Sequence, residues 1–177
     1  MYEKFGQFIE GKWSPSENKE TYEVINPATE EVLGHASKAT PADVDRALKS
    51  AQKGLKVWKK TTPWDRSYIL RKIADRMREK KDVLAKWMTL ENGKPLAEGI
   101  GETNGAADIF EWNAEETKRI FGQTIESRFE DTRVHVYYQP VGVVAALSPW
   151  NFPLILAARK ISTALAAGCS VIIKPDT

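Results

Sequence analysis

The sequence predicts an α/β chain that carries the first strand–helix–strand unit of a doubly wound, parallel sheet. Residues 141–147 and 170–174 are apolar on both faces, which is typical of parallel strands that helices cover on both sides. Residues 154–167 between them are largely apolar and are followed by a glycine, which favours a helix. A strand, a helix and a second parallel strand form one right-handed unit.

Length and composition exclude several classes of protein. The chain has 177 residues, 42% of them hydrophobic, which suits one domain or a piece of a larger one and argues against disorder. A net charge of +2 without a basic stripe predicts no nucleic-acid partner. One cysteine excludes a disulfide framework and fits a reducing compartment. The chain shows no signal peptide or membrane-spanning run, so we expect a cytoplasmic protein with no membrane partner.

The chain begins with a predicted β-meander. Residues 7–13 contain a turn signal at Glu10-Gly11, and residues 20–25 alternate polar and apolar side chains. Residues 31–37 can return as a further strand.

Two helices with clear start signals follow the meander. Thr40 and Thr62 each precede a proline and have an acidic residue three positions later, which is typical of an N-cap. Apolar residues at helical spacing behind them predict helices over 41–59 and 63–91.

A third helix is predicted over 96–121, closed by Gly122. Its glycines, Gly99, Gly101 and Gly105, would each weaken a helix by roughly 1 kcal/mol relative to alanine. We therefore expect them to permit close packing against other backbone segments.

Residues 133–138 alternate between two faces before Pro140 ends the run. This pattern predicts an edge strand that needs a partner. The two parallel strands also lack neighbours, because no further strand pattern remains to complete their sheet. We therefore expect this chain to be the N-terminal part of a longer protein.

The loop 148–153 is the first candidate site. It leaves the carboxyl end of a parallel strand and opens a helix, where ligands bind in doubly wound sheets and free N–H groups attract anions. The amide of Asn151 can donate a hydrogen bond to an oxygen that becomes negative during a reaction. The alternative is that Asn151 only caps the helix.

Lys174 ends the second parallel strand at the same predicted edge. It can hydrogen-bond ribose hydroxyls or attract a phosphate; the alternative is a solvated lysine. The loop lacks a Gly-x-Gly-x-x-Gly motif, so a nucleotide would be held in another way. Cys169, at an apolar junction, is predicted to be a buried core residue, and His35 and His135 have no metal-ligand spacing. No metal site is predicted.

Several motifs of this chain occur together in one enzyme family. They are Asn26-Pro27-Ala28-Thr29, Glu91-Asn92-Gly93-Lys94-Pro95, Gln139-Pro140-Val141-Gly142-Val143, Pro149-Trp150-Asn151-Phe152-Pro153, and Ala166-Ala167-Gly168-Cys169 before Lys174-Pro175. With them the chain resembles, over essentially its whole length, the N-terminal part of an NAD(P)-dependent aldehyde dehydrogenase. It is most similar to the succinate-semialdehyde dehydrogenase branch.

The resemblance implies a domain organisation. Residues 1–130 and 141–177 would belong to a Rossmann-like cofactor-binding domain, of which 141–177 is the first, truncated strand–helix–strand unit. Residues 131–140 would be a protruding oligomerisation strand that pairs with another subunit of a homo-oligomer.

The resemblance also implies roles for the residues at the predicted edge. Asn151 matches an asparagine that helps to stabilise the oxyanion of a thiohemiacetal intermediate. Ser148, Pro149 and Trp150 match the stretch against which NAD or NADP lies. Lys174 matches a lysine that holds the adenosine ribose or a 2′-phosphate.

Pro175, Asp176 and Thr177 complete the cofactor-binding stretch implied by the resemblance. The family usually has a small residue and then glutamate after lysine–proline, so Asp176-Thr177 leaves the choice between NAD and NADP open. Arg159 matches an arginine that binds the distal carboxylate of the substrate, for which a bidentate guanidinium is suited. The alternative is an arginine that reaches solvent from an apolar helix.

Two hypotheses for function remain. The first is the oxidation of a small-molecule aldehyde, such as succinate semialdehyde, to a carboxylic acid with NAD or NADP. The family's nucleophilic cysteine and general-base glutamate would lie beyond this chain, which would be catalytically incomplete alone. The second is a non-catalytic nucleotide-binding or oligomerisation module of the same fold. A CoA-acylating relative is disfavoured by the asparagine motif.

Overall fold

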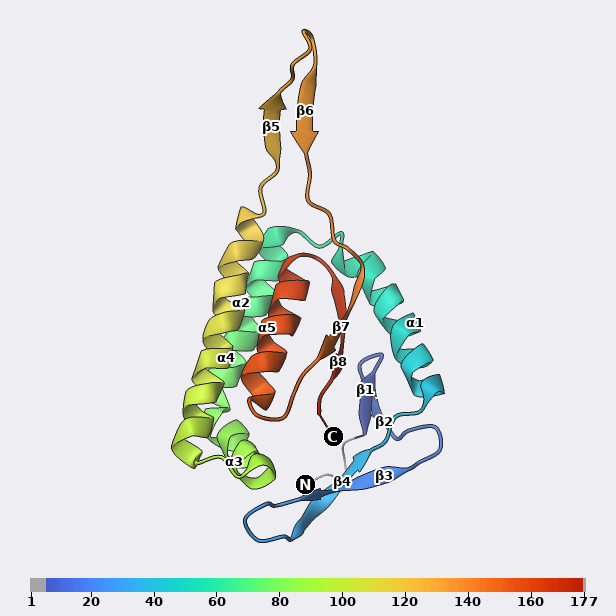
Figure 1. Ribbon diagram of the computed structural model, residues 1–177, viewed down its shortest axis with the longest axis vertical. Coiled ribbons are helices and arrows are strands. Elements are labelled where there is room, and N and C mark those ends of the chain that lie inside the picture. Colours follow the sequence, from blue (N-terminus) through green and yellow to red (C-terminus); the bar gives the residue numbers. More distant parts are fainter. Residues whose placement is uncertain (1–5, 177) are drawn as a thin grey trace.

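The computed structural model describes residues 6–176, which fold into helical layers on both sides of a parallel strand pair (Figure 1). In chain order the elements are β1 (Gln7–Ile9), β2 (Lys12–Ser14), β3 (Thr21–Ile25), β4 (Val32–Ser37), α1 (Pro41–Trp58), α2 (Pro63–Glu79), α3 (Lys81–Asn92), α4 (Leu96–Glu116), a 3₁₀ turn (Thr117–Arg119), β5 (Gln123–Glu126), β6 (Arg133–Val136), β7 (Val143–Leu147), α5 (Pro153–Ala166) and β8 (Ser170–Lys174). Helix α5 covers one face of β7 and β8, and α1 lies against the other.

The strand–helix–strand unit is confirmed. β7 and β8 pair in parallel, and Gly168 ends α5 with a φ of +83°, a conformation that favours glycine. Among the described residues this sheet has two strands, and Leu147 is 64% exposed. The expectation that both faces are fully buried therefore does not hold within this part of the protein.

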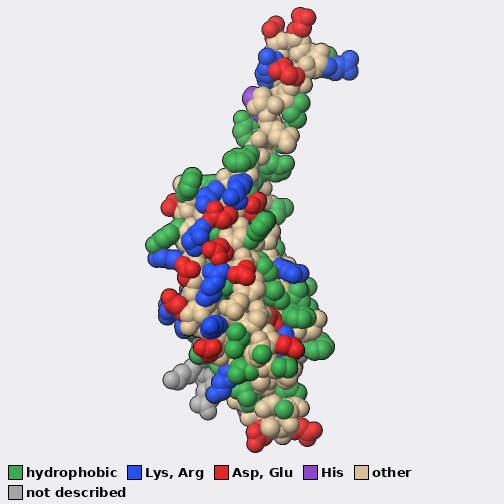
Figure 2. Space-filling model, turned by 90° about the vertical axis from the view of Figure 1, so that its left-hand side faces the viewer, with side chains coloured by type: hydrophobic (Ala, Val, Ile, Leu, Met, Phe, Trp, Pro, Cys, Tyr) green, Lys and Arg blue, Asp and Glu red, His purple; other side chains and the backbone are tan. Residues whose placement is uncertain are grey.

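The core lies between α2, α4 and α5 and is built largely from small side chains. Its buried members are Leu70, Ala74, Ala106, Ala107, Phe110, Ala114, Ala158 and Ala166. Alanines let the three helices approach closely. On the outer face of α2 and α4, basic and acidic side chains are interspersed (Figure 2), as in the ion pair between Arg78 and Glu111 at 2.6 Å.

The N-terminal strands form two separate hairpins, so the predicted meander is wrong. Among the described residues, β1 pairs only with β2, and β3 only with β4. The predicted turn is present, with positive φ values at Glu10 (54°) and Gly11 (76°), the geometry of a tight hairpin turn.

Helix α1 begins at a capping box that also holds the N-terminal hairpins. The buried carboxylate of Asp43 accepts hydrogen bonds from the backbone N–H of Thr40 (2.9 Å), that of Glu17 (3.2 Å) and the side chain of Gln7 (3.3 Å). Burial alone would raise the pKa of Asp43, but these hydrogen bonds outweigh it and hold the pKa at about 2.

Asp43 should make stability depend on pH below about pH 4. Its ordinary pKa of 3.8 is lowered to about 2 on folding, so the ionised form stabilises the fold by roughly 2 kcal/mol above that range. This contribution is lost as the pH falls toward 2. The free energy of unfolding in urea should therefore be clearly higher for the wild type than for Asp43→Asn at pH 6. This difference in free energy should shrink by more than half at pH 2.5. A difference in free energy that stays the same at both pH values would contradict the lowered pKa of Asp43.

The predicted helix over 63–91 is in fact two helices, α2 and α3, which meet at Lys80. Residues 79–83 are all exposed, so no buried side chain anchors the helix there. The predicted third helix is also too long: α4 ends at Glu116, where the 3₁₀ turn begins. The hydroxyl of Thr117 donates to the carbonyl oxygen of Ala166 at 2.6 Å and ties this turn to α5.

Of the three glycines of α4, Gly99 has the expected role against another backbone segment, whereas Gly105 approaches only a side chain. A Cβ at Gly99 would lie 3.0 Å from the carbonyl oxygen of Ala85, and one at Gly105 would lie 3.2 Å from the side chain of Ile155. A Cβ at Gly101 would meet nothing within 4 Å, so the expectation is wrong there.

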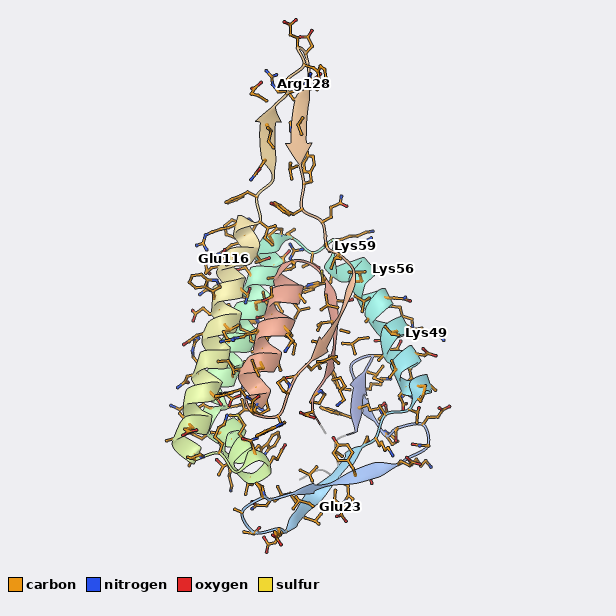
Figure 3. The ribbon with its side chains drawn as sticks, in the orientation of Figure 1. Glu23, Lys49, Lys56, Lys59, Glu116 and Arg128 are labelled. Atoms are coloured by element: carbon orange, nitrogen blue, oxygen red, sulfur yellow. The ribbon has the colours of Figure 1, made fainter. Side chains whose placement is uncertain are left out.

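The edge strand at 133–138 has a partner in its own chain. β6 pairs antiparallel with β5, and the hairpin projects from the helical body as an arm with Arg128 near its tip (Figures 1 and 3). The strand at 123–126 was missed, and β6 ends at Val136 rather than at 138. The predicted boundary at residue 130 lies in the turn of this hairpin. Within the described residues, no helix is long and apolar enough to cross a membrane.

Candidate functional site

The carboxyl ends of β7 and β8 form one edge that carries the predicted site residues. Leu147 lies opposite Lys174 in the parallel ladder, and the N–H of Ser148 donates to the carbonyl oxygen of Lys174 at 3.1 Å. Asn151 follows Leu147 by four residues, so Asn151 and Lys174 share this edge. The placement expected from the strand order is confirmed.

A groove of about 390 Å³ lies beside this edge, between the strand ends, α3 and β3. Its lining includes five of the predicted cofactor-binding residues: Ser148, Pro149, Trp150, Pro175 and Asp176. Asn151 and Lys174 are exposed and adjoin the lining segments in the chain. Thr177 lies outside the described residues. The Oγ of Ser148 is buried and has no hydrogen-bond partner among the described residues.

The open side of the groove is negatively charged. Burial raises the pKa of Tyr22, and the carboxylates of Glu91 and Asp176 raise it further. Tyr22 lines the groove together with both carboxylates, and it stays a neutral phenol at physiological pH. Carboxylates here favour contact with hydroxyl groups over contact with phosphate. In contrast, Lys49, Lys56 and Lys59 are exposed along α1, outside the groove lining (Figure 3).

Asn151 is not a helix cap. The N-cap of α5 is Phe152, and no side chain of its own loop caps the helix. The amide of Asn151 is exposed and forms no hydrogen bond within residues 6–176, whereas its carbonyl oxygen accepts one from the Nζ of Lys94 at 3.1 Å. The side chain is therefore free to donate to a ligand oxygen.

The expectation that the N-terminus of α5 offers free N–H groups to an anion is wrong. One carboxylate oxygen of Glu102, on α4, accepts hydrogen bonds from the N–H of Leu154 (2.9 Å) and of Ile155 (3.1 Å). These are the second and third residues of α5, where a capping side chain normally binds. A buried carboxylate thus already occupies the positive end of this helix.

Arg159 lies in α5 and is exposed, and its guanidinium forms no ion pair with any carboxylate of the described residues. Asn151 precedes α5, whereas Arg159 lies within it, and Phe152 at the start of the helix has a φ of −136°. A role in substrate binding stays a prediction.

Cys169 is buried, as predicted, with 3% of its surface exposed. It directly precedes β8, whose first residue, Ser170, pairs with Val143. Because a strand advances roughly 3.3 Å per residue, Cys169 lies at the far end of β8 from Asn151. The structure also brings the buried Arg66 near Cys169; burial lowers the pKa of Arg66, and the nearby thiol partly offsets this. No cluster of potential metal ligands is present among the described residues.

Sequence reasoning missed the polar residues that line the groove or hold its loop, which are Tyr22, Glu91, Asn92, Lys94 and Glu102. Lys94 belongs to the motif Glu91-Asn92-Gly93-Lys94-Pro95, which served only as a sign of the family and to which sequence reasoning gave no role in the site. The capping role of Glu102 carries no local signal, because Leu154 and Ile155 lie far along the chain.

Comparison with known proteins places the fold and the edge residues in one family. The sequence model of the "Aldehyde dehydrogenase family" matches residues 13–177. The chain belongs to the aldehyde dehydrogenase family. Its relatives include a glutarate-semialdehyde dehydrogenase of Pseudomonas putida, 47% identical over 168 residues, and an NADP-dependent succinate-semialdehyde dehydrogenase of Escherichia coli, 45% identical over 167 residues. The predicted resemblance to the succinate-semialdehyde branch is thereby confirmed.

Solved aldehyde dehydrogenase-type structures share this architecture. An NADP-dependent enzyme of Escherichia coli superposes with a TM-score of 0.94 at 44% identity over 96% of this chain. A betaine aldehyde dehydrogenase of Staphylococcus aureus, solved with NAD+, gives a TM-score of 0.92 at 35% identity over 96% of this chain. The chain spans about a third of the relatives it matches, 35% of each of these four proteins.

Proposed function

We propose that this chain supplies the oxyanion donor and part of the cofactor site of an NAD(P)-dependent aldehyde dehydrogenase, which oxidises a small-molecule aldehyde to a carboxylic acid. The observation that carries the proposal is the shared edge of β7 and β8, which carries the free amide of Asn151 and the side chain of Lys174 and adjoins the groove. Family membership supports the same reaction.

The edge residues suit NAD or NADP. The exposed ammonium of Lys174 can bind ribose hydroxyls, and the lining of Pro149 and Trp150 offers a flat, apolar surface. When bound, the nicotinamide supplies the hydride acceptor. Asn151 would donate to the aldehyde oxygen as that oxygen becomes negative during nucleophilic attack.

The nucleophile must come from outside these residues. The one cysteine of the chain, Cys169, is buried at the opposite end of β8 from Asn151 and cannot meet an aldehyde bound there. We therefore propose that the chain is catalytically incomplete alone. Addition of an external thiolate to the aldehyde, loss of hydride to the cofactor and hydrolysis of the resulting thioester would give the acid.

The substrate class is proposed to be an aldehyde with a distal carboxylate. Relatives at 45–47% identity are named for succinate and glutarate semialdehydes. Arg159 offers an exposed guanidinium without a described carboxylate partner, as binding of an acidic group requires.

We further propose that the β5–β6 arm joins subunits of a cytoplasmic homo-oligomer. A two-stranded hairpin is marginally stable alone in water. This arm exposes Ile125 (45%) and Val134 (43%), and Tyr137 beyond it is 77% exposed. Residues 131–140 keep their proposed role as its returning strand.

A chimera tests the proposed function. These 177 residues would replace the matching third of the Escherichia coli succinate-semialdehyde dehydrogenase, with which they share 45% identity. We expect the chimera to reduce NAD or NADP with succinate semialdehyde at a rate within about tenfold of the parent, and the 177-residue chain alone to show none. A folded chimera that binds nucleotide without turnover would support the non-catalytic module instead, and turnover by the chain alone would contradict the external nucleophile.

A further inference from the structure

We propose that Asn92, Lys94 and Glu102 are positioning residues that fix the loop carrying Asn151, and so set where the oxyanion donor lies. The inference rests on the proposed function for the role of Asn151. The clamp itself, defined as these three side chains, stands on contacts that do not depend on that function.

Lys94 contacts three parts of the structure at once. Its buried ammonium pairs with the carboxylate of Glu102, donates to the carbonyl oxygen of Asn151 at 3.1 Å and lies 4.1 Å from the ring centre of Phe152. A buried ammonium needs such partners, since an unmatched charge is costly inside a protein. Lys94 therefore ties the backbone of Asn151 to α4.

Glu102 extends this tie into α5. One of its carboxylate oxygens pairs with the ammonium of Lys94, and the other accepts hydrogen bonds from the N–H groups of Leu154 and Ile155. Both carboxylate oxygens are used, so Glu102 has a defined orientation. It anchors the loop on the side that follows Asn151.

Asn92 holds the side that precedes Asn151. Its amide donates to the carbonyl oxygen of Trp150 at 2.9 Å. The adjacent Gly93 ends α3 with a φ of 73°, and a Cβ there would lie 3.1 Å from the side chain of Pro27. The turn that carries Asn92 and Lys94 is thus itself fixed by a close approach that favours glycine.

The result is a loop held before and after one free side chain. Four backbone atoms of residues 150–155 accept or donate hydrogen bonds in this clamp, while the amide of Asn151 forms no hydrogen bond among the described residues. A donor fixed before the reaction needs no rearrangement during it, and a small displacement can cost a large factor in rate.

Two substitutions at Asn92 test the clamp without leaving a buried charge unpaired. Asn92→Ala removes the bond to Trp150, and Asn92→Asp places an acceptor opposite the carbonyl oxygen. Asn113→Ala is the matched control: Asn113 is equally half-buried and bridges α4 to Ser162 of α5 at 2.9 Å, away from the loop.

Hydrogen exchange of the 177-residue chain, or of the chimera, measures the loop directly. We expect exchange at Leu154 and Ile155 to rise at least fivefold in Asn92→Ala and further in Asn92→Asp, and to stay within twofold in Asn113→Ala. In the chimera, kcat should fall at least tenfold for Asn92→Asp while the KM for aldehyde changes less than threefold.

Unchanged exchange in both Asn92 variants would overturn the inference whatever the activity. Faster exchange with unchanged kcat would overturn the link between the clamp and catalysis. An inactive wild-type chimera with the expected exchange pattern would count against the proposed function alone, and the clamp would stand.

Discussion

Replacing Asn151 by alanine should lower the kcat of the chimera by about 10²–10³-fold, the effect typical of removing one oxyanion donor. The amide of Asn151 is exposed at the edge of β7 and β8 and forms no hydrogen bond among the described residues, so its loss should leave the fold intact. The KM for nucleotide should change little, because other residues line the groove. Steady-state kinetics with succinate semialdehyde measures both constants.

Asn104→Ala serves as the control for this effect. Asn104 is an exposed asparagine on α4, and its loss should change kcat less than twofold. If Asn151→Ala also lowered kcat less than tenfold, Asn151 would not be an oxyanion donor.

Replacing Lys94 by methionine should lower the free energy of unfolding by about 3–5 kcal/mol, because it leaves the buried carboxylate of Glu102 without its partner. The double variant Lys94→Met with Glu102→Gln should recover most of this loss. The amide oxygen of glutamine can still accept from the N–H groups of Leu154 and Ile155, and no charge remains buried. Urea unfolding of the chain measures the difference.

An exposed ion pair provides the control for Lys94. Lys53 pairs with Glu10 at 2.7 Å, and their side chains are 73% and 52% exposed. Lys53→Met should therefore change the free energy of unfolding far less than Lys94→Met. If Lys53→Met and Lys94→Met lowered the free energy of unfolding equally, burial of the Lys94–Glu102 pair would not explain the effect of Lys94→Met.

Local signals predicted the elements whose ends are marked by particular residues. Thr40 and Thr62 cap α1 and α2 as expected, and Gly168 ends α5. The apolar residues on both faces of the segments 141–147 and 170–174 predicted that β7 and β8 pair in parallel. These features are determined by residues that are close together in the chain, so a local sequence pattern can predict them.

Features without a local sequence pattern were missed. β5 is a short strand with every residue exposed to solvent, and its identity comes from its pairing with β6. The break between α2 and α3 arises where no buried contact holds the helix, although the local pattern continues to favour one.

The candidate site divides in the same way. The shared edge of Asn151 and Lys174 follows from strand order, which predicts it without side-chain detail. The capping of α5 by Glu102 could not be predicted, because α4 and α5 meet only in the folded chain. That contact explains why the expected anion site at this helix is already filled.

We expect the carboxyl edge of β7 and β8 to hold the nucleotide. A crystal structure of the chimera with NAD or NADP would show whether it does. We expect a ribose hydroxyl or 2′-phosphate within hydrogen-bond distance of Lys174, and the nicotinamide beside Trp150 and Asn151. A nucleotide bound at the amino ends of these strands, near Cys169, would contradict the account.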